Sequence, residues 1–267
     1  MTTSQELPDP AVPPAAYTEE WFRTTCGDSS AWSPDGTKEI GGIYLHALDR
    51  LGFQPGQVLV DLGCGRGELI VLAAQKGAKR AIGIEYAPAA VDLALQTVAG
   101  YGVGDRAEVL LADVRDVPVD DGGADALTLL DVVEHLSADE LDRALTQARR
   151  ILRPGGRLFA HTFPNRLLYD VTYRLQRSLV PWRWKTWPAD PRNELERLMH
   201  VNEQSRSSLR RSLQNAGFND IAVTHGEWIY TDFVPDEGAK RIYGRLARYR
   251  ITEAYGRANI LAHATNP

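Results

Sequence analysis

The sequence is organised around a glycine-rich turn at residues 63–67. The residues just before it, Val58–Val60, are apolar and mostly β-branched, which predicts a buried parallel strand that ends at Asp61. Glycines occupy three alternate positions of the turn, and a helix is expected to open near Glu68. A turn without side chains lets a ligand lie against the backbone, and the helix behind it offers free N–H groups. The stretch therefore predicts a ligand site at the end of the first strand.

The spacing of the glycines narrows the choice of ligand. A dinucleotide-binding turn has the pattern G-x-G-x-x-G, with the pyrophosphate at the helix N-terminus. Here the third glycine, Gly67, comes one residue early, and an acidic residue, Asp61, precedes the first glycine, Gly63. An acid at this position favours a ligand with a cationic end over a pyrophosphate.

The segment Asp61–Gly67 resembles the first motif of the class I S-adenosylmethionine-dependent methyltransferases. Further motifs follow in order: an acid ending a second strand at Glu85, Asp113-Val114 after a third strand, the segment Asp131–Leu136 after a fourth, and the Pro-Gly-Gly turn at residues 154–156. Four motifs at this spacing are more specific than any one alone. The resemblance covers residues 56–162 by motif and residues 205–265 by topology only.

The resemblance implies an α/β fold with a doubly wound, seven-stranded Rossmann-like sheet. It also implies a last strand, over Arg257–Thr265, that inserts antiparallel beside the sixth. The implied cofactor is S-adenosylmethionine, with S-adenosylhomocysteine as the product and no metal. A substrate lid is expected to be inserted after the fifth strand, because about forty residues, 163–204, stand where a short connection would suffice.

The expected cofactor site lies at the carboxyl ends of the strands. Glu85 follows the glycine turn by about twenty residues, where a doubly wound fold places a carboxylate against ribose hydroxyls. The resemblance implies that Tyr86 covers the adenine and that the Asp113 carboxylate and the Val114 N–H read it. The full predicted set is Asp61, Gly63, Gly65, Glu85, Tyr86, Asp113, Val114 and Asp131.

The predicted domain organisation is one methyltransferase domain over residues 17–267, preceded by a Pro-rich, flexible N-terminus at residues 1–16. Residues 17–54 are expected to form cap helices, one over Tyr17–Thr25 and one over Thr37–Leu51. The first either packs on the core or covers the cofactor pocket. Residues 163–204 are the lid, and residues 232–250 form a second insertion with a basic helix.

The predicted catalytic residue is His135. A sulfonium methyl group is attacked in line, so a base is needed only where the nucleophile holds a proton. His135 follows the fourth strand, a position that faces the methyl group in the family; the alternative is a structural histidine. The residues predicted to contact substrate are Tyr17, His161, Trp182, Arg183, Trp184 and His200.

The composition of the lid suggests its occupant. Its tryptophans and arginines suit an anionic or aromatic substrate, or transient contact with an anionic membrane surface. The alternative is an ordinary solvated face with core tryptophans. The chain of 267 residues has a net charge of −5, which argues against a nucleic-acid partner.

The remaining composition points to a cytoplasmic protein without membrane insertion. No run of about 18 apolar residues occurs, and the N-terminus lacks the apolar core of a signal peptide. The two cysteines, Cys26 and Cys64, have no metal-ligand spacing.

We therefore expect an enzyme that transfers a methyl group to oxygen, nitrogen or carbon of a small molecule, such as a specialised metabolite, a sugar or a lipid-linked intermediate. The alternatives are a protein or nucleic-acid methyltransferase, or a relative that binds the cofactor without methylating. The sequence leaves the acceptor atom, the substrate and the oligomeric state open.

Overall fold

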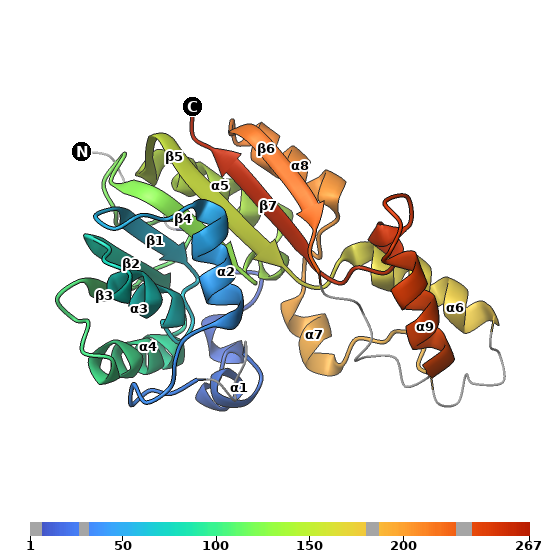
Figure 1. Ribbon diagram of the computed structural model, residues 1–267. Helices are drawn as coiled ribbons and strands as arrows, with labels where there is room; N and C mark the ends of the chain where they lie inside the picture. Colours follow the sequence, from blue (N-terminus) through green and yellow to red (C-terminus); the bar gives the residue numbers. More distant parts are fainter. Residues whose placement is uncertain (1–6, 27–31, 180–186, 228–236) are drawn as a thin grey trace.

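A computed structural model describes residues 7–26, 32–179, 187–227 and 237–267. Its centre is a seven-stranded sheet with the strand order β3-β2-β1-β4-β5-β7-β6 (Figure 1). The strands are β1 (Val58–Leu62), β2 (Arg80–Glu85), β3 (Ala107–Leu111), β4 (Ala124–Leu130), β5 (Leu152–Thr162), β6 (Asn219–His225) and β7 (Ile260–Thr265). All neighbours are parallel except β7, which is antiparallel to both β5 and β6. The predicted doubly wound sheet is confirmed.

Helices cover both faces of the sheet. The α-helices in the described residues are α1 (Glu19–Thr24), α2 (Gly42–Leu51), α3 (Glu68–Gln75), α4 (Pro88–Gly100), α5 (Ala138–Ile151), α6 (Arg174–Leu179), α7 (Glu194–Met199), α8 (Arg206–Asn215) and α9 (Glu237–Leu246). Short turns of other helix types are η1 (Pro14–Ala16), η2 (Val133–His135), η3 (Leu168–Tyr173) and η5 (Glu253–Tyr255). Side chains of α5 and α8 form one buried cluster, and side chains of α2 and α3 form another on the opposite face.

The central strands are buried on both faces, which explains their continuous apolar runs. Leu59 and Val60 of β1 have no exposed surface, and they belong to the two different core clusters. The chain reverses its winding at β1, which pairs with β2 on one side and β4 on the other. In such sheets a crevice opens outside the carboxyl ends of the strands at this point.

One predicted boundary of the N-terminal region is wrong, and part of the predicted flexible segment is anchored to the domain. The second cap helix begins at Gly42 rather than at Thr37. Residues 7–16, expected to be flexible with the rest of 1–16, are packed instead: Val12 is 2% exposed, and its carbonyl accepts a hydrogen bond of 3.0 Å from the Tyr86 hydroxyl. The proline content indicated an irregular backbone for this segment. It gave no sign of the apolar cluster against which Val12 packs.

The segment between β5 and α8 is largely helical in its described part. It contains η3, α6 and α7, while residues 180–186 lie outside the described residues. In Figure 1, α6 and α9 lie together at the end of the molecule away from β3, and α7 lies between this end and the sheet. The predicted basic helix of the second insertion corresponds to α9.

Gly83 in the middle of β2 is required by close packing under the glycine turn. An added Cβ would lie 2.6 Å from the Cys64 sulfur and 3.1 Å from the Ile70 Cδ1 atom. Such contacts force a shift of the turn or of α3.

We predict that Gly83→Ala lowers the free energy of unfolding by about 1–3 kcal/mol, the usual cost of overpacking a core. Chemical denaturation measures it. Gly104→Ala is the matched control, because its added Cβ would meet only Val98, at 3.9 Å. Equal stability of the two variants would contradict the packing argument.

Candidate functional site

The glycine turn adopts a backbone that ordinary residues avoid. Gly63, Gly65 and Gly67 have φ angles of 76°, 53° and 83°. At Gly63 an added Cβ would also lie 2.5 Å from a methyl carbon of Val132. The turn thus depends on glycine for its conformation and for the close approach of the segment after β4.

The Glu85 side chain at the end of β2 is hydrogen-bonded to this turn. One carboxylate oxygen accepts from the backbone N–H of Gly65 at 3.0 Å, and the other accepts from the N–H groups of Tyr86 and Ala87, both at 2.9 Å. Burial nevertheless raises the pKa of Glu85 to about 7. Because an oxygen has two lone pairs, the oxygen facing Gly65 retains one for a further donor.

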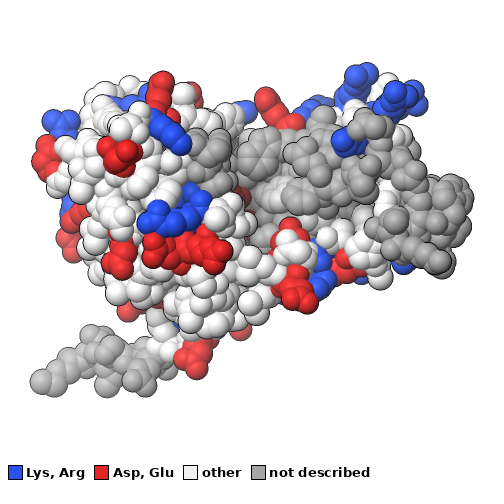
Figure 2. All heavy atoms as spheres, turned by 90° about the horizontal axis from the view of Figure 1, so that it is seen from below, with Lys and Arg blue, Asp and Glu red and all other residues white. Residues whose placement is uncertain are grey.

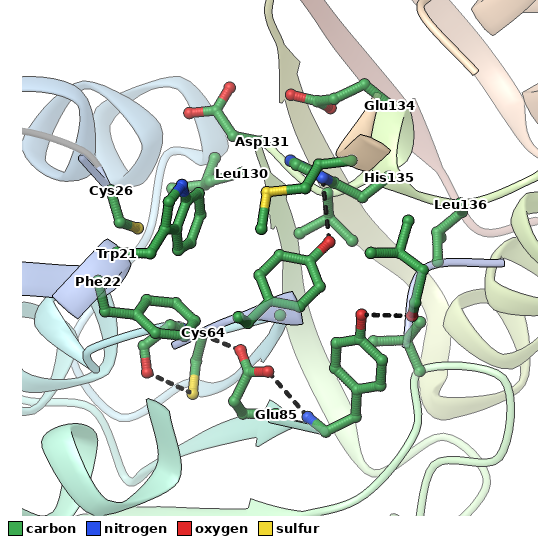
Figure 3. A pocket seen from close by; sticks show the side chains of 18 of the residues that line it. Trp21, Phe22, Cys26, Cys64, Glu85, Leu130, Asp131, Glu134, His135 and Leu136 are labelled. Atoms are coloured by element: carbon green, nitrogen blue, oxygen red, sulfur yellow. Dashed lines mark hydrogen bonds between the residues drawn. The ribbon is translucent and has the colours of Figure 1, made fainter. Parts of the chain in front are cut away.

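A cavity of about 480 Å³ opens at this edge of the sheet. Figure 3 shows Glu85 on its lower side and Asp131, Glu134 and His135 along its upper side. Other lining residues come from the N-terminal segment, from α1, from the ends of β1 to β5 and from α7; they include Pro10, Val12, Tyr17, Trp21, Phe22, Cys26, Tyr44, Leu195, Met199 and His200. The cavity therefore joins residues that are far apart in the sequence.

Asp61 lines the cavity beneath the turn and is itself buried. Its carboxylate accepts a 2.6 Å hydrogen bond from the Thr128 hydroxyl of β4. Burial raises its pKa to about 7, and the Thr128 bond opposes that shift. The acid before the first glycine is therefore poised between its charged and neutral forms.

Asp113, predicted to contact adenine, is held by a buried arginine. Arg115 donates from Nε and from a terminal nitrogen to the two Asp113 oxygens, at 2.9 and 2.7 Å. Arg115 also contacts Glu140 at 3.1 Å, and Glu140 accepts from the Ala11 N–H at 2.8 Å. This chain of bonds connects the N-terminal segment to the end of β3.

Asp131 has an unusual backbone and a fixed carboxylate. Its φ is 54°, and its side chain lies 2.7 Å from Nδ1 of His161. The Asn259 amide nitrogen lies 3.0 Å from Nε2 of His161, and the amide N–H donates to this ring nitrogen. Nδ1 of His161 therefore carries the ring proton and donates a hydrogen bond to Asp131. His161, predicted to contact substrate, is 1% exposed and is not among the lining residues. It orients Asp131 from behind.

Two histidines and a tyrosine meet on the other side of the cavity. The Tyr17 hydroxyl lies 3.0 Å from Nδ1 of His135, and the His135 and His200 rings are 5.0 Å apart, edge to face. Burial lowers the pKa of His135 to about 3 and that of His200 to about 4. Burial also raises the pKa of Tyr17 well above its usual value. All three groups are neutral at pH 7.

The structure brings most of the predicted residues together. Every predicted cofactor residue lines the cavity, and so do Tyr17, His135 and His200. Trp182, Arg183 and Trp184 lie outside the described residues.

Sequence reasoning missed the apolar residues that α7 adds to the cavity, Leu195 and Met199. Phe22 belongs to the first cap helix, which was expected either to pack on the core or to cover the cofactor pocket. Nothing local marks α7, because its contact with the cavity depends on the path of the whole segment after β5.

Within residues 7–26, 32–179, 187–227 and 237–267, no three His, Cys, Asp or Glu side chains are grouped as metal ligands. No described helix is long and apolar enough to cross a bilayer.

The sheet order, the glycine turn and the acid ending β2 define a Rossmann-like protein with a nucleotide-type ligand site at its switch point. Residues 59–156 match the family model described as a methyltransferase domain. These residues therefore form a methyltransferase domain, and the match and the relatives below support the class I S-adenosylmethionine-dependent type.

Individual relatives share only part of the chain. A tuberculostearic acid methyltransferase of Mycobacterium tuberculosis is 31% identical over 65% of this chain and 39% of its own length. A probable tRNA methyltransferase 9B of Mus musculus is 29% identical over 48% of this chain and 26% of its own length. The chain spans 34% to 39% of the length of the first three curated relatives that it matches, the methyltransferase of Mycobacterium tuberculosis among them.

A solved structure shares the fold over nearly the whole chain. It is the complex between the Haloferax volcanii Trm112 methyltransferase activator and a putative methyltransferase. The likeness covers 98% of this chain and 100% of that one, with a TM-score of 0.59 and 20% identity. At this identity the likeness concerns the fold alone.

The buried histidines predict a loss of stability in mild acid. The unfolded chain binds a proton at a histidine near pH 6.5, whereas folded His135 does so only near pH 3. The unfolded state therefore takes up more protons as the pH falls below about 6.5, and unfolding is favoured, by at most about 1.4 kcal/mol per pH unit for this group.

We predict that His135→Asn loses less stability than the parent between pH 7 and pH 5, measured by denaturation at each pH. The raised pKa values of Asp61 and Glu85 act in the opposite direction in both proteins, so the difference between them isolates the histidine. Parallel pH profiles would contradict the burial of a neutral His135.

Proposed function

We propose that the protein transfers a methyl group from S-adenosylmethionine to a small, largely apolar molecule. The observation that carries the proposal is one continuous cavity, with the glycine turn and Glu85 at one side and the neutral His135 and His200 at the other. The first side suits the cofactor, and the second suits an acceptor.

The cofactor is proposed to lie along the ends of β1 to β4. The free lone pair of Glu85 would accept from a ribose hydroxyl, and Tyr86 would flank the adenine. Oδ2 of Asp113 accepts one hydrogen bond from Arg115, so its second lone pair could accept a hydrogen bond from the adenine amine. The Val114 N–H would donate to the adenine ring. Asp61 and Asp131, below and above Gly63 and Gly65, would face the cationic methionine end.

The acceptor is proposed to be uncharged over most of its surface. On the α7 side the wall includes Leu195 and Met199, and Phe22 of α1 adds an apolar ring beside the glycine turn. Of the described lining residues, the two arginines are already paired: Arg66 with Glu68 at 2.6 Å, and Arg115 with Asp113 and Glu140. An anionic acceptor would find no uncompensated cation among these residues. The alternative of an anionic acceptor depends on Arg183, which lies outside the described residues.

The names of the relatives support an apolar acceptor only in part. The tuberculostearic acid methyltransferase is named for a fatty acid, whereas the probable tRNA methyltransferase is named for a nucleic acid. The net charge of −5 favours the first kind of acceptor. The second candidate function is binding of the cofactor without transfer of its methyl group. Release of S-adenosylhomocysteine in the presence of apolar acceptors would distinguish methyl transfer from binding alone.

His135 is proposed as the catalytic residue. As a neutral imidazole that lines the cavity, it would accept the proton of an acceptor hydroxyl or amine while the methyl group transfers. Tyr17 would orient it through Nδ1. His200, Tyr17 and the segment 163–204 are proposed to contact the acceptor, the last as a lid over the cavity.

We predict that Glu85→Gln weakens binding of S-adenosylmethionine by about 1.5–3 kcal/mol, the range for a hydrogen bond to a charged group. The variant keeps the shape of the side chain but replaces an acceptor by a donor. Calorimetry gives the affinity, and Asp92→Asn, an exposed acid of α4, is the control. Unchanged affinity would refute the ribose assignment.

We predict that His135→Ala lowers kcat about 10²-fold, the low end for a general base, because burial weakens its basicity. Cofactor affinity should be retained. In the parent, kcat should stay level between pH 5 and pH 8, since the group ionises near pH 3. A near-normal rate for the variant would return His135 to a structural role, and a bend in kcat near pH 6.5 would contradict its depressed pKa.

A further inference from the structure

Exposed apolar side chains concentrate outside the sheet. Among the described residues, ten large hydrophobic side chains are exposed, and seven of them lie between residues 171 and 255. They are Val171, Leu175, Leu198, Val201, Tyr249, Ile251 and Tyr255. Single exposed apolar residues are ordinary on a soluble surface, but an accumulation in one part of the chain marks an interaction surface.

The most exposed of these side chains stand in the turn that follows α9. Ile251 is 91% exposed and Tyr249 is 67% exposed. They alternate with Arg248 and Arg250, which are also exposed. We refer to residues 248–251 as the Arg-Tyr-Arg-Ile tip.

The tip is held in place by its own backbone. The carbonyl of Tyr249 accepts from the N–H groups of Thr252 and Glu253, at 2.9 and 2.8 Å. The Thr252 hydroxyl donates to the carbonyl of Leu246 at 2.8 Å, and the intervening Ala247 is buried. The turn therefore presents Ile251 to solvent as a fixed feature of the fold, at the cost of leaving an aliphatic side chain in water.

The charge around the tip is opposite to that of the protein as a whole. Residues 237–257 contain six Lys or Arg and two Asp or Glu, a net charge of +4, in a chain of net charge −5. Arg241 and Arg245 on α9 are exposed like the arginines of the tip. Figure 2 shows Lys and Arg gathered at the end of the molecule that carries α6 and α9.

A second apolar pair lies on the neighbouring elements. Val171 of η3 and Leu175 of α6 are four residues apart, are 40% and 60% exposed, and so project from one side of this helical segment. η3 is in contact with η5, which directly follows the tip. A second exposed aliphatic pair thus lies on a segment that adjoins the end of the tip.

We propose that the Arg-Tyr-Arg-Ile tip, with α9 behind it, docks the protein on an anionic lipid surface. Arginines are attracted to acidic headgroups, tyrosine is suited to the headgroup layer, and an aliphatic side chain enters the acyl boundary. A nucleic acid would use the arginines and the tyrosine but would leave Ile251 in water. The inference is independent of the proposed methyl transfer.

The test is sedimentation of the full chain with vesicles of phosphatidylglycerol and phosphatidylcholine, compared with vesicles of phosphatidylcholine alone. We expect binding to the anionic vesicles only, with a strong decrease at high salt. Ile251→Glu should lower the constant for binding to anionic vesicles at least tenfold. The double variant Arg248→Glu with Arg250→Glu should lower it by a similar factor. Thermal melts of both variants should match the parent, because the changed side chains are exposed.

Two control variants match these changes elsewhere on the surface. Leu95→Glu replaces an apolar side chain of α4 that is 49% exposed, and Lys76→Glu with Arg143→Glu removes the same net charge from exposed positions far from the tip along the chain. Both should bind vesicles like the parent. Equal binding to neutral vesicles, or equal losses in the control variants, would overturn the proposal.

Two further outcomes would assign the tip to another partner. Dimers that dissociate in Ile251→Glu, seen by analytical ultracentrifugation without vesicle binding, would make it a contact between copies of this chain. Binding of single-stranded RNA that is lost in the arginine variant, again without vesicle binding, would make it a nucleic-acid surface. Each result refutes the lipid assignment without bearing on methyl transfer.

Discussion

The site depends on the hydrogen bond between the Glu85 carboxylate and the backbone N–H of Gly65. It joins the end of β2 to the turn after β1, two strands that pair side by side. The bond requires a buried carboxylate, which burial pushes toward protonation, and three N–H donors oppose that shift. The same side chain thus fixes the shape of the turn and supplies the acceptor that a ribose would need. Packing below the turn, where Cys64 meets Gly83, leaves little freedom for it to relax.

The sequence predicted the sheet and one side of the cavity because both are local. Apolar runs, glycine spacing and an acid at a strand end are readable from a few residues, and the strand predicted to begin at Val58 is β1. The other side is built from segments distant in the chain. His135 and His200 meet only because the segment after β5 turns back over the cavity, and no local pattern encodes that path. His161 was predicted to contact the substrate because it stands at a strand end. In the structure its two ring nitrogens are hydrogen-bonded to Asp131 and Asn259, and it does not line the cavity.

Electrostatics separate the two sides of the cavity. Around the glycine turn, Asp61, Glu85 and Asp131 present carboxylates, which suits a cationic sulfonium cofactor. Toward α7, Leu195 and Met199 make part of the wall apolar, and burial lowers the pKa values of His135 and His200. Glu196 of α7 also lines this side, and burial raises the pKa of its carboxyl group. Such a division would suit a charged methyl donor on one side and the proposed acceptor on the other, and methyl transfer removes the positive charge from the sulfur. Desolvation of the reacting atoms follows from the apolar wall rather than from any single residue.

The packed N-terminal segment has a kinetic consequence. Ala11 bonds to Glu140, Val12 bonds to Tyr86, and Tyr17 bonds to His135, so that one strap of residues closes the cofactor side and the acceptor side together. If the cofactor lies where it is proposed, its exchange would involve release of these bonds. Opening of the strap, and not the chemical step, would set the turnover rate whenever it is slower than transfer. Ligands on either side would slow its opening, which couples the residence time of one ligand to the presence of the other.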